Sequence, residues 1–179
     1  MRKTTSLALL CLALAAVPAR ASFESAASAA QAKDWKKVRR LVEKGASPDS
    51  SGSGRTLLMW AALQGDLEAM NFLFEKGAAP DLTKAGRSAL EVSFSTGAVS
   101  LLLSKEADPK RRAVLAGRAL MSGYASSPEA FRLLIDAGGL DEYPGDKNEL
   151  LTKAALYPRS FFLLYEARST STLPAMVLV

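Results

Sequence analysis

Apolar side chains recur at the spacing of one helical face between residues 35 and 44. Val38, Leu41 and Val42 are the apolar positions of the run WKKVRRLVEK after its first residue, and charged side chains fill the others. Residues at i, i+3 and i+4 lie on the same side of an α-helix, so the run predicts an amphipathic helix. Gly45 follows, at a position where helices commonly end in the left-handed conformation. The pattern predicts a helix that buries one face and stops at glycine.

The same pattern returns 32 residues later. Glu43-Lys44-Gly45-Ala46 falls on Glu75-Lys76-Gly77-Ala78, and Pro48-Asp49 falls on Pro80-Asp81. Residues 54–81 are the clearest copy, with a predicted turn, a short helix, a bend at Gly65, a second helix and a glycine stop. A long self-match at a fixed period is typical of a solenoid.

Later copies are progressively less regular. The third begins at Gly86, and Gly97 matches Gly65, but its second-helix apolar residues match only at a shift of 29. Three residues are therefore missing after Gly97, which predicts a short second helix closed by residues 107–109. The fourth copy has a long first helix over 112–122 and a second helix that Ser127 caps and Pro128 begins.

A fifth, partial copy follows from Leu150, with a second helix opened by Pro158. We therefore predict an all-α solenoid of about five stacked helix pairs over residues 22–168, the last two divergent. That exceeds the roughly three repeats that stacking needs for stability. Residues 169–179 form an apolar tail that caps the last repeat or docks on a partner.

Period and residues together resemble the ankyrin repeat. Its pattern, G-x-T-P-L-H-x-A-A, a glycine bend and V-x-x-L-L-x-x-G-A-D, corresponds here to Gly54, Thr56, Leu58, Ala61, Ala62, Gly65, Met70, Leu73, Phe74, Gly77 and Ala78. Leu57 replaces the family's proline and Met59 its histidine, so we expect turns less regular than the family norm. A tetratricopeptide array is the competing solenoid, but it lacks the glycine-ended second helix followed by a Pro-Asp turn.

Residues 1–21 have the three parts of a secretory signal peptide: a basic start, an apolar run over 7–17, and small residues before a cleavage site. Cleavage after Ala21 is expected, with Ala19 as the second option. A membrane anchor is disfavoured because the apolar run is well short of the ~20 residues that span a bilayer. Cys11 lacks the small preceding residue of a lipidation site. We expect export to a bacterial periplasm and no integral membrane segment after cleavage.

Signal removal changes the charge balance. It takes away three basic residues, leaving 20 against 18 acidic ones, a net charge near +2 instead of +5. A general nucleic-acid partner thereby loses its compositional support. The exported chain would contain no cysteine and no histidine, which excludes disulfides, Ser-His-Asp and Cys-His catalysis, and metals held by those ligands. We expect no cofactor, no metal and no catalysis, although an enzyme using Asp, Glu, Lys or Tyr stays open.

An acidic cluster surrounds Pro144-Gly145. Its members are Asp141, Glu142, Asp146 and Glu149. The alternating spacing of calcium ligands is missing, so a solvated turn is the favoured interpretation.

Surface residues at the turn tips are the remaining candidates for function. The resemblance implies that partners dock on the concave face, which the tips and first helices line. Arg55 and Arg87 occupy the same repeat position, and stacking would place them side by side. The candidate protein-binding residues are Arg55, Arg87, Trp60, Lys84, Arg111 and Arg112. A basic row of this kind would bind an acidic protein surface.

The alternatives for these residues are structural. The basic side chains would be solubilising turn charges offset by Asp49, Asp81 and Asp108, and Trp60 would pack between repeats. Two functions fit the binding interpretation. One is a non-catalytic scaffold for an envelope protein. The other is an immunity or inhibitor protein that neutralises a toxin or hydrolase in the same compartment.

Overall fold

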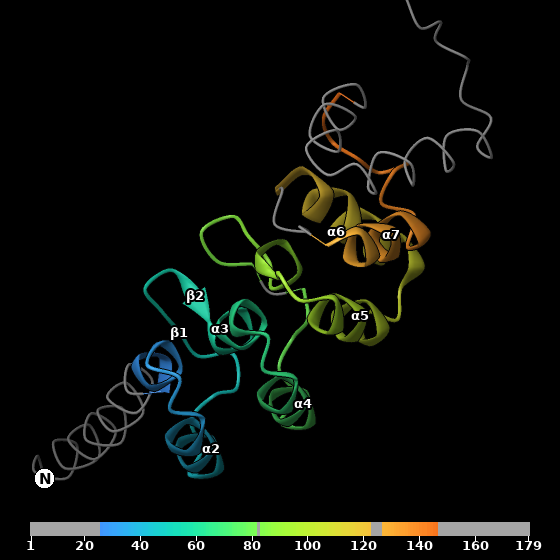
Figure 1. Cartoon of the computed structure of the whole chain (residues 1–179). Coiled ribbons are helices and arrows are strands. Elements are labelled where there is room, and N and C mark those ends of the chain that lie inside the picture. Colours follow the sequence, from blue (N-terminus) through green and yellow to red (C-terminus); the bar gives the residue numbers. More distant parts are fainter. Residues whose placement is uncertain (1–25, 82, 123–126, 147–179) are drawn as a thin grey trace, which may run out of the picture.

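The computed structural model describes residues 26–81, 83–122 and 127–146 (Figure 1). Residues 26–31 are helical, and helix pairs then follow one another along the molecule. The elements after this first helix are α2 (Trp35–Glu43), β1 (Ser51–Gly52), β2 (Arg55–Thr56), α3 (Leu57–Gln64), α4 (Leu67–Glu75), η1 (Leu90–Val92), α5 (Thr96–Lys105), α6 (Pro109–Ser122) and α7 (Pro128–Asp136). The described residues thus form four helix pairs, as an all-α solenoid requires.

The second helix of every described pair begins with the same hydrogen bond. A side-chain oxygen accepts from the backbone N–H three residues further on, which satisfies a donor that the helix itself leaves unpaired. The four pairs are Asp34 with Lys37, Asp66 with Ala69, Ser95 with Ala98 and Ser127 with Ala130, at 2.9–3.4 Å. The predicted capped start at Ser127, with Pro128 in the first turn, is confirmed.

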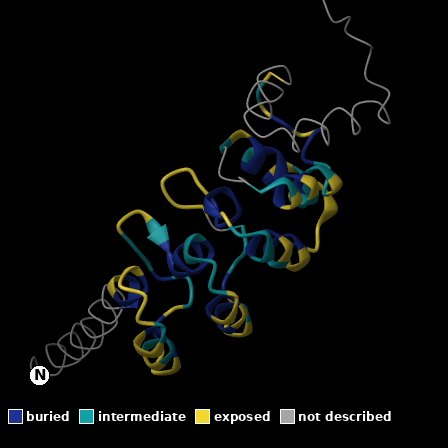
Figure 2. Cartoon of the chain, viewed as in Figure 1, coloured by how far each residue is buried: buried dark blue, intermediate teal, exposed yellow. Residues whose placement is uncertain are grey.

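The core follows the register predicted from the repeat. Val38, Met70, Val99 and Phe131 are the matched first positions of the four second helices, and all are buried. Leu73, Leu102 and Leu134, three residues on, are buried as well. Figure 2 shows the buried residues on the sides of the helices that face their neighbours. Each helix pair therefore hides its apolar face against the next one, which is how a solenoid is stabilised.

The third copy differs from the sequence prediction. Its second helix, α5, is not short, since it runs for 10 residues. The first helix is the short one and consists of the three-residue 3₁₀-helix η1. Ser95 caps α5, so Gly97 lies inside that helix instead of making the bend as Gly65 does. The deletion therefore shortens the first helix and not the second. Because Ser95 already caps α5, too few residues lie between Leu90 and Ser95 for a longer first helix.

The fourth copy begins earlier than predicted. Helix α6 starts at Pro109, not at Arg112, so Pro109 opens this helix instead of closing the third repeat. Proline suits a first helical position because the N–H that it lacks would be unpaired there. The Asp108 carboxylate accepts from the backbone N–H of Lys110 at 2.9 Å and of Arg111 at 3.4 Å.

Several predicted regions lie outside the described residues. They are the signal peptide (1–21), the helices of the fifth copy and the tail at 169–179. Within the described ranges, none of the helices combines the length and apolar character needed to cross a membrane.

Candidate protein-binding site

Two finger-like tips project from consecutive repeats and have the same conformation. In the first, Ser51 pairs with Thr56 and Gly52 with Arg55, around Ser53 and Gly54. In the second, Lys84 and Arg87 exchange two backbone hydrogen bonds, of 2.8 and 3.0 Å. The two central residues of each turn have positive φ, between 51° and 74°, as tight hairpin turns require.

The two tips touch. A Cβ placed on Gly54 would lie 3.8 Å from the Cβ of Ala85. Arg55 and Arg87 each follow the glycine of their tip, at Gly54 and Gly86. The backbone positions of these two arginines are therefore on neighbouring tips, and the side-by-side placement of their side chains stays a prediction.

The hydrogen bonds beneath the tips correct the expectation of irregular turns. Met59 occupies the position where the repeat pattern has histidine, and its sulfur lies 3.4 Å from the backbone nitrogen of Thr56. In the next repeat Glu91 occupies the same position, and its Oε2 accepts from the Ser88 N–H at 2.6 Å. Both side chains thus supply the acceptor that was expected to be missing.

Arg55 and Trp60 form a stacked pair at the base of the first tip. The guanidinium carbon lies 4.8 Å from the centre of the indole ring, the geometry of a cation–π contact. Trp60 is only 8% exposed, and its buried indole N–H has no hydrogen-bond partner among the described residues. Packing therefore accounts for most of the tryptophan surface, and Arg55 is the member of the pair that a partner would meet first.

The second tip is tied to α6 by a residue that sequence reasoning did not single out. Nη2 of Arg118 donates to the carbonyl oxygen of Gly86 at 2.7 Å and lies 3.2 Å from Oε1 of Glu91. Glu91 is 4% exposed, so this is a nearly buried carboxylate with one cation and one backbone donor. The sequence signal for Glu91 was its position three residues after Ser88, the spacing at which a glutamate accepts from a backbone N–H in a capping box. No such signal indicated Arg118.

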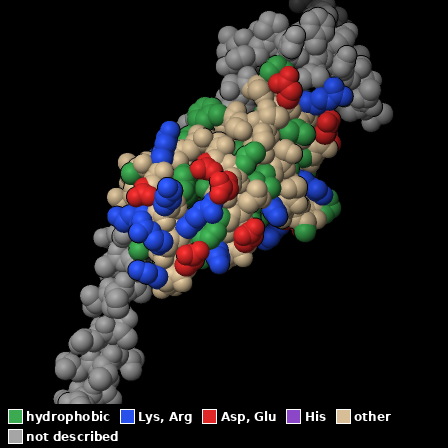
Figure 3. Space-filling view, turned by 60° about the horizontal axis from the view of Figure 1, so that its bottom comes forward, with side chains coloured by type: hydrophobic (Ala, Val, Ile, Leu, Met, Phe, Trp, Pro, Cys, Tyr) green, Lys and Arg blue, Asp and Glu red, His purple; other side chains and the backbone are tan. Residues whose placement is uncertain are grey.

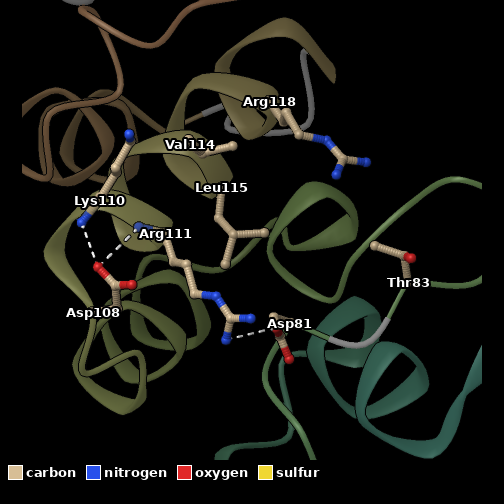
Figure 4. Close-up of a pocket in the computed structure, with 8 residues that line it drawn as sticks. All are labelled: Asp81, Thr83, Asp108, Lys110, Arg111, Val114, Leu115 and Arg118. Carbon is tan, nitrogen blue, oxygen red and sulfur yellow. Dashed lines mark hydrogen bonds and ion pairs between the residues drawn. The ribbon is translucent and has the colours of Figure 1, made fainter.

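Arg111 lies beside a hollow between α6 and the loop that follows the second repeat (Figure 4). The hollow has a volume of about 340 Å³. Its lining residues are Asp81, Thr83, Asp108, Lys110, Arg111, Val114, Leu115 and Arg118. Nη1 of Arg111 lies 3.4 Å from Oδ2 of Asp81. Arg112, the sixth candidate, is half-buried on α6 and does not line this hollow.

Three acidic residues were expected to offset the basic turn charges, and each of them makes a structural contact. Asp49 accepts from the backbone N–H of Ala79 at 2.9 Å, which joins two repeats. Asp81 pairs with Arg111, and Asp108 caps α6. Stacking and capping thus explain these acids. Lys84 and Arg87 are exposed on the tip.

Basic residues also gather on the second-helix side of the molecule. Figure 3 shows Lys and Arg side chains crowded toward its left end, with both charges mixed elsewhere. Helix α2 contributes Lys36, Lys37 and Arg40 as exposed residues, and Lys44 follows directly after the helix. This surface is distinct from the tips and offers a matched control for charge changes there.

Within the described residues, no group of three or more acidic, histidine or cysteine side chains is arranged to hold a metal ion. The arrangement instead offers cations on tight turns, one of them stacked on an aromatic ring, and a nearby hollow lined by apolar and charged residues. Such a surface can bind another macromolecule, because aromatic residues and arginine dominate binding energy at protein interfaces.

Comparison with known families agrees with this architecture. Residues 26–113 match ankyrin repeats, in three copies. The match runs from the first described helix to the beginning of α6, and so covers both tips and their supporting helices. No curated protein is similar enough to the chain to count as a match. Ankyrin repeats generally mediate protein–protein interaction and are typically non-catalytic. Residues 26–113 of the chain are therefore similar to ankyrin repeats, in three consecutive copies.

Proposed function

We propose that this chain is a non-catalytic scaffold of the bacterial periplasm, which captures an acidic surface of another envelope protein. Its binding surface comprises the tips at 51–56 and 84–87 together with the first turn of α6. One observation carries the proposal. Two neighbouring tips share the same turn conformation, with Gly54 next to Ala85, and both have an arginine directly after the tip glycine.

The electrostatics of the tips support a protein partner with negative charge. Arg55 is held against Trp60, so less side-chain freedom is lost when it pairs with a carboxylate. Arg118 fixes the second tip through the Gly86 carbonyl. Rigid, preorganised cations favour both rapid encounter and register with an oppositely charged surface.

Support for the periplasm comes from the signal-peptide pattern of residues 1–21 and the absence of cysteine after it. An exported repeat protein without disulfides depends on packing alone, and the buried register of Val38, Met70, Val99 and Phe131 supplies that packing.

Reversing the tip charges should weaken partner capture. The double variant Arg55→Glu/Arg87→Glu replaces attraction by repulsion at both tips, and we expect at least a roughly tenfold loss of affinity, about 1.4 kcal/mol. The tagged chain would be expressed in its source cells and recovered from the envelope fraction, and co-purifying proteins identified by mass spectrometry. Affinity for the recovered partner is then measured at two salt concentrations, since exposed charge pairs weaken with salt.

The matched control is Lys36→Glu/Lys37→Glu, which makes the same charge change on α2. Unchanged helical circular dichroism in both variants would show that the repeats remain folded. Equal capture by the tip variant and the wild type would refute the tips as the binding site. Recovery of no specific partner would refute the scaffold itself, whereas recovery of a toxin or hydrolase would favour an inhibitor.

A further inference from the structure

The hollow beside Arg111 lies where the second repeat meets the fourth helix pair. Figure 4 shows α6 on one side of it and the chain at Asp81 and Thr83 on the other. Its volume of about 340 Å³ falls within the range of roughly 300–1,000 Å³ that is usual for ligand pockets. Arg118 lines it and also holds the second tip, so the hollow continues the surface that the tips form.

The floor of the hollow is apolar. Val114 and Leu115 lie between the charged residues in Figure 4. Val114 is 37% exposed and is one of four large apolar side chains that stay exposed in the described part of the chain. Apolar side chains that face a concave space with polar groups around it are typical of binding sites.

The rim carries both charges. Lys110, Arg111 and Arg118 contribute three positive charges, against two from Asp81 and Asp108, and Arg118 is itself paired with the buried Glu91. Asp108 also accepts the backbone N–H groups that begin α6. Lys110 and Arg111 are therefore the cations of the lining that a carboxylate entering the hollow would meet.

The ion pair across the hollow is easily exchanged. The side chains of Arg111 and Asp81 are 65% and 37% exposed, and their charged atoms are 3.4 Å apart. Exposed pairs of this kind contribute little to stability because water and salt screen them. A partner carboxylate can take the place of Asp81 on the guanidinium of Arg111 without disturbing the fold.

We propose that this hollow receives a short acidic segment of the protein partner, in which a large apolar side chain stands next to an aspartate or glutamate. The apolar side chain rests on Val114 and Leu115, and the carboxylate displaces Asp81 from Arg111. This inference rests on the proposed function, because it assigns a specificity pocket to the same binding surface.

The test uses a library of random 12-residue peptides displayed on phage, selected against the full chain. Enriched peptides are synthesised with a fluorophore, and their dissociation constants are measured by anisotropy. We expect the enriched sequences to share an apolar residue adjacent to Asp or Glu. Replacing that acidic residue in the peptide by its amide should weaken binding at least fivefold.

Substitutions in the hollow should move the affinity in opposite directions. Asp81→Asn leaves Arg111 without its competing carboxylate and should tighten peptide binding about threefold to tenfold. Val114→Glu places a negative charge on the floor and should weaken binding at least tenfold. Val114→Ser is the milder second variant, and circular dichroism confirms that each variant is folded.

The outcomes separate this inference from the proposed function. Failure to enrich any peptide, enrichment of peptides without carboxylates, or binding that is indifferent to Val114→Glu would overturn the pocket. If peptide affinity then changes only in the variant Arg55→Glu/Arg87→Glu, the tips are the binding surface and the hollow is not part of it. Peptides that depend on Val114, together with partner capture indifferent to the tip charges, would keep the pocket and refute the tips.

Discussion

Replacing Arg118 by methionine should destabilise the chain by about 2–3 kcal/mol. The variant keeps an unbranched apolar stem but leaves the Glu91 carboxylate, 4% exposed, without its cation and with the Ser88 N–H as a donor. Breaking one partner of a buried ion pair costs about 3–5 kcal/mol. The Arg118 side chain is 32% exposed, so solvent screens part of that loss. We therefore expect a cost at or just below the lower end of this range.

The destabilisation would be measured by urea unfolding, followed by circular dichroism. A double-mutant cycle with Glu91→Gln identifies its cause, because glutamine retains an oxygen for the Ser88 N–H and removes the charge. If the loss comes from an unpaired buried charge, the double variant should recover about 1–2 kcal/mol relative to the sum of the single changes. Additive effects would contradict this explanation.

Arg132→Met is the matched control. Arg132 pairs with Asp136 within α7 at 3.8 Å, and both side chains are 64% exposed. An exposed pair of this kind contributes about 0.5 kcal/mol or less. A loss at Arg132 as large as that at Arg118 would mean that removal of any arginine, not burial of Glu91, is what weakens the fold.

The second helices were predictable because two local signals coincide in each of them and a third in all but one. A capping side chain begins the helix, apolar residues recur at i, i+3 and i+4, and glycine ends the first, second and fourth copies. Gly45, Gly77 and Gly138 indeed have φ between 86° and 101°. These signals survive in the fourth copy, where Ser127, Phe131 and Leu134 cap and bury α7 although the rest of that repeat has diverged.

The first helices were less predictable, since the shortened third copy has two possible alignments. Matching Gly97 to Gly65 puts the deletion after the bend, whereas matching Ser95 to Asp66 puts it in the first helix. The hydrogen bond from the Ala98 N–H to Ser95 Oγ shows that the second alignment, with Ser95 matched to Asp66, is the one that the structure adopts. Sequence alone treats the two glycines as equivalent, but one has φ 68° at a helix end and the other lies inside α5.

The candidate site was likewise predictable from the sequence only in part. The period of 32 residues predicted that Arg55 and Arg87 share a position, because register alone determines it. The contact between Arg118 and the second tip and the hollow over Val114 depend on residues from different repeats, whereas the contact of Arg55 with Trp60 is a side-chain pair within one repeat. Their partners are not at a constant spacing, so no periodic pattern indicates them.

Substituting Gly117 by alanine should destabilise the C-terminal part of the solenoid by about 2–4 kcal/mol. Gly117 lies inside α6, where alanine would normally gain about 1 kcal/mol of helix propensity. Here the new Cβ would lie 2.5 Å from the carbonyl oxygen of Glu142 and 3.0 Å from that of Gly139. Both are backbone atoms, so relief of the clash requires the segment after α7 to move, and such overpacking is costly.

Gly97→Ala is the matched control, since it also adds one methyl group to a helical glycine. Its closest neighbour would be Cδ1 of Leu67 at 3.0 Å, the free end of an exposed side chain that can turn away. We expect a change of about 0.5 kcal/mol or less for Gly97→Ala by urea unfolding. Equal effects of the two substitutions would show that the contact between α6 and residues 139–142 is not a tight one.

The location of the damage is the more informative result. Stability in a solenoid is approximately a sum of repeat and interface terms, so a clash in the fourth pair need not reach the first two. Hydrogen exchange measured by mass spectrometry should therefore show protection lost in α6 and α7 of the Gly117→Ala variant and retained in α2 and α4. Uniform loss would mean that the repeats unfold as one unit. Loss confined to α6 and α7 would separate the parts of the proposed binding surface, because the first tip would persist while the hollow beside Arg111 opened and the second tip lost its contact with Arg118.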